Sequence, residues 1–394
     1  MNILYLGLFR FPEGDAAASR VLNNARLFRD LGHSVKILSF GGEYREQDIS
    51  LDGYVYDGLH YVITHDIDTH SWKERFLRYI YPNPNARNYI AANIDSFDIV
   101  VSYNTTLPMN IYLQHICKKH GKKIILDVTE WPDSNELLGG KLSPIYWMSE
   151  LNMRFIQKHF KNMIPISQFL NRFYSHSNNI LLPPLIDIND TKWNCFKPVD
   201  FTSVNHYNGV RIIFAGTPAR KDLLKNLVEA IVQVLNEGQV IQLVVAGVSI
   251  EQANQFCAED ILSKYRNDIV FLGRIPQSLV PSLYHISTFS AIIREPSRKN
   301  TAGFPTKMVE SMAAGCPVLL NITSDLGDYA IDGENAVLIE NYHVCSIKEG
   351  LMSILSMTNE KISKMKLCAR KTGEQRFDYH NYMEMGLRFI NNLK

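Results

Sequence analysis

The sequence lacks the features that mark several classes of protein. No apolar run approaches the length of a membrane span, and there is neither an internal repeat nor a low-complexity tract. Lys and Arg number 41 against 40 Asp and Glu, so the chain has no basic footprint for a nucleic acid. The six cysteines form no C-x-x-C pair, and no H-E-x-x-H spacing predicts a metal site. We therefore expect reduced thiols, a cytoplasmic location, and neither a nucleic-acid partner nor a resident metal.

What the chain does have is the length and the alternation of an α/β protein. At 394 residues, 46% hydrophobic and 21% charged, it is long enough for two ordinary globular domains. Strand patterns at 2–7 and 34–40 enclose an amphipathic helix pattern at 16–31, which predicts a βαβ unit and a parallel sheet. The pattern restarts with a strand at 209–217, a helix at 221–238 and a strand at 240–248.

The boundary between the two halves is predicted from composition. Residues 178–209 are rich in Pro, Asn and Asp and keep no sustained period, as a linker does. We predict one doubly wound domain over 1–186 and a second over 187–374. The tail, 375–394, is predicted to form a helix that packs back on the first domain.

One stretch, "NTAGFPTKMVESMAAGCPVL" (Asn300–Leu319), carries most of the chemistry. Pro305 is suited to the first helical position, and Gly315 to the end of the helix. Apolar residues recur between them at helical spacing, while Lys307 and Glu310 share another edge of the helix. Because free backbone N–H groups and the dipole of a helix attract anions, the stretch predicts a phosphate site with a cation and a carboxylate close by.

In its order of motifs the chain resembles a GT-B glycosyltransferase, most closely the retaining glycosyltransferase family 4. "SRVLNNARLFRDLGHSVKIL" resembles the family's first helix and its Gly-His turn, and "ISQFLNRFYSHSNNILLPPLID" the end of the acceptor domain. "IIFAGTPARKDLLKNLVEAI" resembles the start of the donor domain, and "GFPTKMVESMAAGCPVLL" the nucleotide-sugar motif. The resemblance implies two Rossmann-like domains that face each other across a cleft.

The resemblance also assigns roles in the second domain. It implies that Glu310 accepts hydrogen bonds from both ribose hydroxyls of a nucleotide sugar. Gly303 and Phe304 offer backbone N–H groups to the diphosphate or the sugar, since glycine lacks the Cβ that would obstruct approach. Either Lys307 or the Arg220–Lys221 pair can neutralise the phosphates. An isolated Lys–Glu pair on a helix is usually only a solvated surface pair, and the motif favours the functional interpretation.

The loop "GTPARKD" follows a strand and precedes a helix, so a β-phosphate fits at that helix N-terminus. The family's Arg after the glycine, Gly216, is Thr217 here, which leaves Arg220 and Lys221 as the available cations. Lys221 falls where the family has its phosphate-binding Lys.

A second departure from the family is Ala302, where many relatives carry a Glu that touches the donor sugar. The sequence offers three substitutes for that Glu, namely Arg294, Asn300 and Thr301.

In the first domain, the loop "FRFPEGDAAASR" brings Gly14 and Arg20 to the region that relatives use near the diphosphate and the acceptor. "DVTEWP" lies at a predicted strand end, where many relatives carry a His; Asp127 and Glu130 are the candidates to orient the acceptor hydroxyl or the donor sugar. We favour Glu130. A carboxylate that caps a turn and an ordinary helix Arg are the structural alternatives.

The sequence thus predicts a retaining hexosyltransferase that needs no metal and no cofactor, with a nucleotide diphosphate sugar as donor. The acceptor is expected to be a glycan or a lipid-linked saccharide of a surface polysaccharide. Residues 71–82, "SWKERFLRYIYP", interleave aromatic and basic residues and are a candidate for peripheral contact with the inner face of a membrane, or for packing on the first domain. Two alternatives stay open: a nucleotide-sugar epimerase on the same fold, and a weakly catalytic partner subunit of a glycosyltransferase complex.

Overall fold

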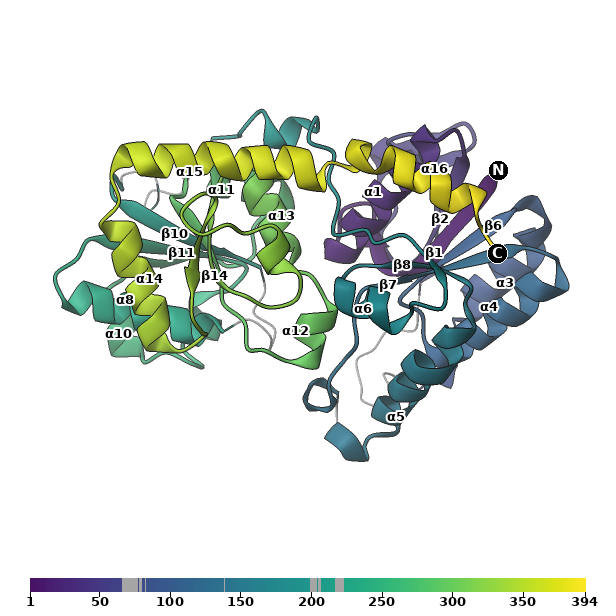
Figure 1. Cartoon of the computed structure of the whole chain (residues 1–394), viewed down its shortest axis with the longest axis horizontal. Helices are drawn as coiled ribbons and strands as arrows, with labels where there is room; N and C mark the ends of the chain where they lie inside the picture. Colours follow the sequence, from purple (N-terminus) through teal and green to yellow (C-terminus); the bar gives the residue numbers. More distant parts are fainter. Residues whose placement is uncertain are drawn as a thin grey trace. The chain divides into compact units, whose positions relative to one another are not determined.

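The computed structural model describes residues 1–65, 77, 80–81, 83–137, 139–198, 204, 207–216 and 223–394 (Figure 1). They form two compact units. The first comprises Met1–Ile186, Thr301–Phe304 and Tyr379–Lys394; the second comprises Asp187–Asn300 and Pro305–Asp378. In these described ranges, no helix is both long and apolar enough to cross a membrane.

The first unit is built on a nine-stranded sheet with the order β3-β4-β5-β2-β1-β6-β7-β8-β9. Only the β3–β4 and β4–β5 pairs are antiparallel, and the other pairs are parallel. The strands are β1 (Asn2–Phe11), β2 (Ser34–Gly42), β3 (Ile49–Ser50), β4 (Gly53–Tyr56), β5 (Leu59–Ile63), β6 (Ile99–Tyr103), β7 (Lys123–Val128), β8 (Asn162–Pro165) and β9 (Asn178–Asn179). The helices are α1 (Ala16–Asp30), α3 (Pro84–Asn93), α4 (Leu107–Lys119), α5 (Pro144–Leu151), α6 (Gln168–Phe173) and α16 (Met383–Asn391).

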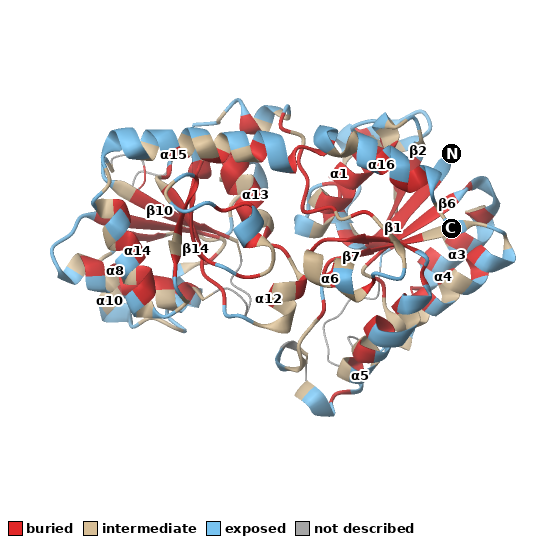
Figure 2. Ribbon diagram, in the orientation of Figure 1, coloured by how far each residue is buried: buried red, intermediate tan, exposed pale blue. Residues whose placement is uncertain are grey.

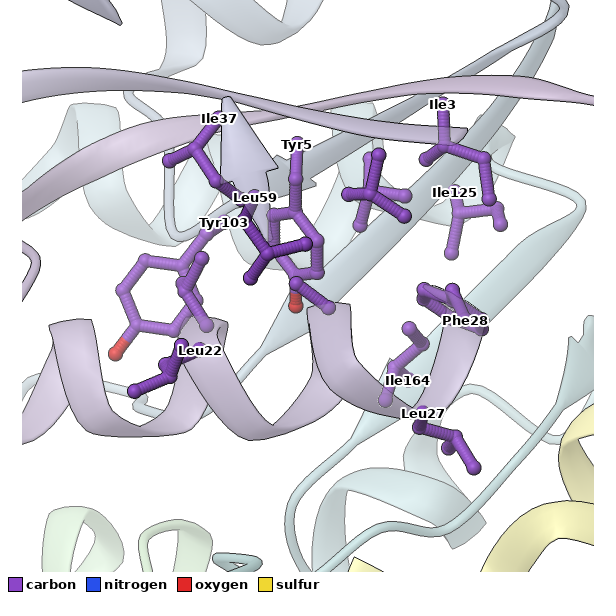
Figure 3. Packing of buried hydrophobic residues seen from close by; sticks show 14 of the residues in the cluster. Ile3, Tyr5, Leu22, Leu27, Phe28, Ile37, Leu59, Tyr103, Ile125 and Ile164 are labelled. Atoms are coloured by element: carbon purple, nitrogen blue, oxygen red, sulfur yellow. The ribbon is translucent and has the colours of Figure 1, made fainter. Parts of the chain in front are cut away.

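Alternate residues of β1 build two cores in the first unit, because successive side chains of a strand point to opposite faces of the sheet. Ile3 and Tyr5 pack with α1 and α16, whereas Leu4 and Leu6 pack with α3 and α4. Figure 3 shows Tyr5 and Tyr103, from neighbouring strands, packed over the side chains of α1. The chain returns to this unit after the second one, and the Tyr379 amide donates to the Ile186 carbonyl at 2.9 Å.

The second unit is built on a six-stranded, wholly parallel sheet with the order β12-β11-β10-β13-β14-β15. The strands are β10 (Val210–Ala215), β11 (Ile241–Ala246), β12 (Ile269–Phe271), β13 (Phe289–Ile292), β14 (Val318–Asn321) and β15 (Ala336–Ile339). The helices are α8 (Leu224–Asn236), α9 (Ile250–Ala253), α10 (Glu259–Lys264), α11 (Val280–Ile286), α12 (Arg298–Ala302), α13 (Thr306–Ala313), α14 (Val344–Leu355) and α15 (Asn359–Thr372).

Helices cover both faces of the second sheet, and its strands are therefore buried over almost their whole length (Figure 2). Figure 1 shows α8 and α14 on one face, and α11, α13 and α15 on the other. The predicted α/β class with two parallel-sheet domains is confirmed.

Two local features differ from the prediction. The antiparallel strands β3, β4 and β5 extend the first sheet at one edge, and the sequence analysis named none of them. The helix of the nucleotide-sugar stretch begins at Thr306, with Pro305 at the N-cap rather than at the first helical position. Pro305 has an extended ψ of 109°, so it lies outside the helix. Gly315, at φ 71°, follows the end of that helix as predicted.

Candidate functional site

The order of the second sheet marks where a ligand is expected. Strand β10 lies between β11 and β13, so the connections on its two sides run in opposite directions. Open parallel sheets bind ligands outside the carboxyl ends of the strands at such a switch point. Gly216 directly follows β10, and Ile293 and Arg294 directly follow β13.

Lys307 reaches this switch point from the first turn of α13. Its Nζ lies 4.0 Å from the centre of the ring of Phe214, which is near the carboxyl end of β10. The negative face of an aromatic ring attracts a cation, so Phe214 holds the ammonium group at the carboxyl end of the sheet. Lys307 is predicted from the sequence as a phosphate cation, and the structure places its charge beside Gly216.

Gly216, which has no side chain, leaves room for the side chain of Lys307. A Cβ at this position would lie 2.8 Å from Lys307 Cε and 3.3 Å from Lys307 Nζ. The backbone of Gly216 also has φ 123°, a conformation that other residues rarely adopt. The glycine is required here by close side-chain approach and by backbone conformation together.

Glu310 lies one turn after Lys307 on α13, and its side chain is partly exposed to solvent. Because protein atoms surround the carboxyl group, desolvation raises its pKa, while the positive charges of Lys192 and Lys307 act in the opposite direction. The carboxylate therefore lies in a half-enclosed, positively charged neighbourhood, which suits an acceptor of hydroxyl hydrogen bonds.

Among the described residues, the N-termini of α8 and α13 have no side-chain cap, and the same is true of α10, α11 and α14. Helix α13 begins after Pro305, and α8, which follows the loop after β10, begins after Leu223. Helix α1 of the first unit differs, because the Asp15 carboxylate accepts from the Ala18 amide at 2.7 Å. A helix N-terminus without a side-chain cap can offer backbone donors to an anion, whereas at α1 a carboxylate already occupies that place.

The loop ahead of α13 is grouped with the first unit. Thr301–Phe304, and with them Gly303 and Phe304, belong to that unit. The Ser167 hydroxyl donates to the Ala302 carbonyl at 2.6 Å, and Ala302 is fully buried. Gly303 and Phe304 directly precede Pro305, the N-cap of α13. Their predicted contact with the donor stays a prediction.

The remaining candidates of the second unit divide into two groups. Arg220 and Lys221 lie outside the described residues. Arg294 and Asn300 are buried, and both make internal bonds: the Arg294 amide donates to Asn321 Oδ1 at 2.9 Å, and Asn300 Nδ2 donates to the Glu295 carbonyl at 2.8 Å.

In the first unit, Arg20 and Asp127 bind each other. Arg20 Nη2 lies 2.8 Å from Asp127 Oδ1, and both side chains are buried. Asp127 also accepts from the Tyr5 hydroxyl, and Arg20 donates to the Leu182 carbonyl at 2.9 Å. In this structure neither group faces solvent. Their geometry is that of a structural pair that joins α1, β1 and β7 to the segment after β9.

Gly14 forms a tight turn behind the end of β1. Its amide donates to the Arg10 carbonyl at 2.8 Å, and a Cβ there would lie 2.4 Å from Arg10 Cβ. The glycine therefore has a packing reason of its own, besides the predicted approach to a ligand.

Glu130 is exposed, just past the carboxyl end of β7. The residue before it, Thr129, is held by Asn104: the Thr129 amide donates to Asn104 Oδ1 at 3.0 Å, and Asn104 has φ 43°. Strained residues of this kind gather at functional sites. The accessible carboxylate of "DVTEWP" is thus Glu130 rather than Asp127, and its role stays a prediction.

Sequence reasoning missed Phe214 and Lys192, and also Tyr5 and Asn24, which both donate to the Asp127 carboxylate. Lys192 acts on Glu310 across more than a hundred residues of sequence, and nothing in its local pattern marks it. Phe214 has a weak signal, because it ends a buried strand directly ahead of a glycine loop. Tyr5 and Asn24 read as ordinary strand and helix residues.

Comparison with known proteins agrees with this geometry. Residues 201–372 match the family described as glycosyl transferases group 1. No curated protein sequence gives a significant match. Sucrose-phosphate synthase from Thermosynechococcus elongatus has a similar structure, with a TM-score of 0.76 at 13% identity over 99% of this chain and 98% of that one.

Two further solved structures resemble the whole chain. Anabaena Alr3699/HepE in complex with UDP has a TM-score of 0.69 at 14% identity, covering 100% of both chains. WaaG, a glycosyltransferase involved in lipopolysaccharide biosynthesis, has a TM-score of 0.66 at 14% identity, covering 99% of both. The chain thus has the GT-B fold, and its residues 201–372 match the glycosyl transferases group 1 family.

Proposed function

We propose that the protein is a retaining hexosyltransferase that takes a sugar from a nucleotide diphosphate donor. The observation that carries the proposal is the position of Lys307, held over the Phe214 ring at the switch point of the second sheet, with Glu310 one turn further on. A cation, a carboxylate and uncapped helix N-termini together match a diphosphate next to a ribose. That HepE has been solved with UDP and with UDP-glucose supports the same class of donor.

In the proposed reaction each group has one task. Lys307 and the backbone amides of α13 neutralise the diphosphate, and Glu310 accepts the ribose hydroxyls. Glu130 orients the acceptor hydroxyl. In front-side, retaining transfer the leaving phosphate takes the acceptor proton, so no strong protein base is needed. Since the proposed cations come from the protein, neither a metal nor a cofactor takes part.

We further propose that the acceptor is a glycan or a lipid-linked saccharide in surface polysaccharide synthesis, and that the protein works in the cytoplasm at the inner face of the membrane. WaaG, which has the same fold, is involved in lipopolysaccharide biosynthesis, and this supports the class of acceptor. The segment 71–82, expected to contact a membrane, lies mostly outside the described residues.

A transfer assay tests the proposal. After a thermal-shift screen of UDP- and GDP-sugars, labelled sugar should pass from the stabilising donor to a membrane glycolipid extract, and activity should persist in EDTA. Glu130→Gln should lower turnover far more than it weakens UDP binding, whereas Glu349→Gln, at an exposed position on α14, should change neither. Loss of activity in EDTA that manganese restores would contradict the metal-free proposal, and unchanged turnover in Glu130→Gln would remove Glu130 from it.

A further inference from the structure

A helical stretch of the first unit exposes a row of large apolar side chains. Helix α5 continues through Asn152–Ile156 and Gln157–His159. Trp147, Leu151 and Phe155 recur every four residues along it and are 57%, 48% and 59% exposed. Leu142, in the turn just before the helix, is 94% exposed. Ile145, Asn152 and Met153 are buried on the opposite side, so the row faces outward (Figure 2).

Two contacts within the first unit fix the orientation of Trp147 in this row. The Trp147 indole N–H donates to the Lys141 carbonyl at 2.9 Å, which ties the helix to the turn that carries Leu142. The Trp147 ring also meets Tyr146 edge-on at 5.3 Å. Because the polar atom of the indole is already bonded, its ring is available for an apolar surrounding.

The segment that carries the row has an excess of positive charge. Residues 139–161 contain four cations, Lys141, Arg154, Lys158 and Lys161, against a single Glu150, a net charge of +3 where the whole chain has +1. Glu150 is buried: its Oε1 accepts from the Trp131 indole at 2.9 Å and its Oε2 from Arg154 at 2.7 Å. Within residues 139–161 the exposed charges are therefore all positive.

We propose that this surface, the α5 face (Leu142, Trp147, Leu151 and Phe155 with Lys141, Lys158 and Lys161), docks on an anionic lipid bilayer. An apolar row with an aromatic residue and a cationic rim is the pattern of a helix that lies in the membrane interface. A symmetric pairing of two copies would bring the same cations together, which disfavours self-association. The inference deepens the proposed function, on which it rests, by naming the surface that brings the protein to a lipid-linked acceptor.

Sedimentation with vesicles tests the α5 face on the full chain. The wild type should bind phosphatidylglycerol-containing vesicles, bind pure phosphatidylcholine weakly, and lose binding as salt rises. Trp147→Ser with Phe155→Ser should lower the partition coefficient tenfold or more, because two apolar anchors are lost. Lys141→Glu with Lys161→Glu should lower it by a similar factor. Leu367→Ser, 72% exposed on α15 of the second unit, is the matched control and should bind as the wild type does.

Binding of UDP and the thermal midpoint, measured on each variant, separate the α5 face from the donor site. Both should stay at wild-type values in all of them. Equal vesicle binding by wild type and the Trp147/Phe155 variant would overturn the proposal. So would self-association that disappears in that variant without any vesicle binding. If vesicles bind as expected but no nucleotide does, the proposed transferase function fails and the α5 face stands.

Discussion

At the scale of single residues, Lys307 and Gly216 depend on each other. The Lys307 side chain occupies the space where a side chain at position 216 would lie, and its ammonium group contacts the face of the Phe214 ring. We expect Gly216→Ala to displace Lys307 and to lower the affinity for UDP about tenfold, as Lys307→Ala does, because either change removes one charge-assisted contact to the diphosphate.

The double variant distinguishes this coupling from two independent losses. Once Lys307 is absent, Gly216→Ala should cost little further affinity, and titration calorimetry on the four proteins measures the coupling. Gly238→Ala is the control: Gly238 has φ 78°, and in the described part of the chain nothing lies within 4 Å of the added methyl group. It should lower the thermal midpoint through backbone strain and leave UDP binding unchanged. Additive losses at positions 216 and 307 would contradict the coupling.

The ionised Glu310 side chain, which we propose binds the ribose, is expected to lower the free energy of unfolding. Desolvation raises its pKa above the ordinary value of 4.5, so the folded protein holds this proton more tightly than the unfolded chain does. The free energy of unfolding then falls as pH rises from that value through the raised pKa. Glu310→Gln removes the penalty and should raise the thermal midpoint at pH 8 by a few degrees, but not at pH 4.

Melting curves of the wild type and the variant across pH measure this difference. Glu349→Gln, at an exposed site on α14, should leave the midpoint unchanged at both pH values. A midpoint of Glu310→Gln below that of the wild type at pH 8 would show that the carboxylate stabilises the fold, contrary to this account.

At the scale of elements, Arg20 and Asp127 fasten α1 to the sheet. A buried charge that loses its partner is costly, so Arg20→Ala or Asp127→Ala should destabilise the protein by about 3–5 kcal/mol. Replacing both together, Arg20→Met with Asp127→Leu, should cost clearly less than the sum of the single changes. Glu384→Ala, which breaks the exposed Arg388–Glu384 pair on α16, should cost under about 1 kcal/mol. Denaturant unfolding of the set gives these values, and a mild effect of Arg20→Ala would contradict the structural role.

The regular elements could be predicted because their signals are local. The stripe on α13, Met308, Val309, Met312 and Ala313, is fully buried as its helical spacing indicates, and Gly315 ends the helix in the expected conformation. The short antiparallel edge strands carry few residues, and their pairing is set by neighbours in the sheet. A partner such as Asp127 for Arg20, 107 residues apart, has no local signal at all.

At the scale of the whole molecule, each of the two units is built on its own sheet. The second sheet has the order of a doubly wound nucleotide-binding domain, and its switch point gathers Gly216, Phe214 and Lys307. The order of motifs along the sequence was enough to predict this fold. It was not enough to predict which side chains turn inward, because burial of Asp127 and Arg20 depends on two strands, a helix and the segment after β9, which meet only in the folded chain.

Titration of UDP into the wild type and Glu310→Ala tests the central claim most directly, with Glu349→Ala as the control carboxylate. The wild type and the control should bind alike, while Glu310→Ala, still folded by its melting curve, should bind at least tenfold more weakly because charge-assisted bonds to the ribose are lost. A 2′-deoxyribose nucleotide should bind the wild type poorly and lose little further in Glu310→Ala. Equal affinity of the wild type and Glu310→Ala for UDP would contradict the claim that α13 holds the nucleotide.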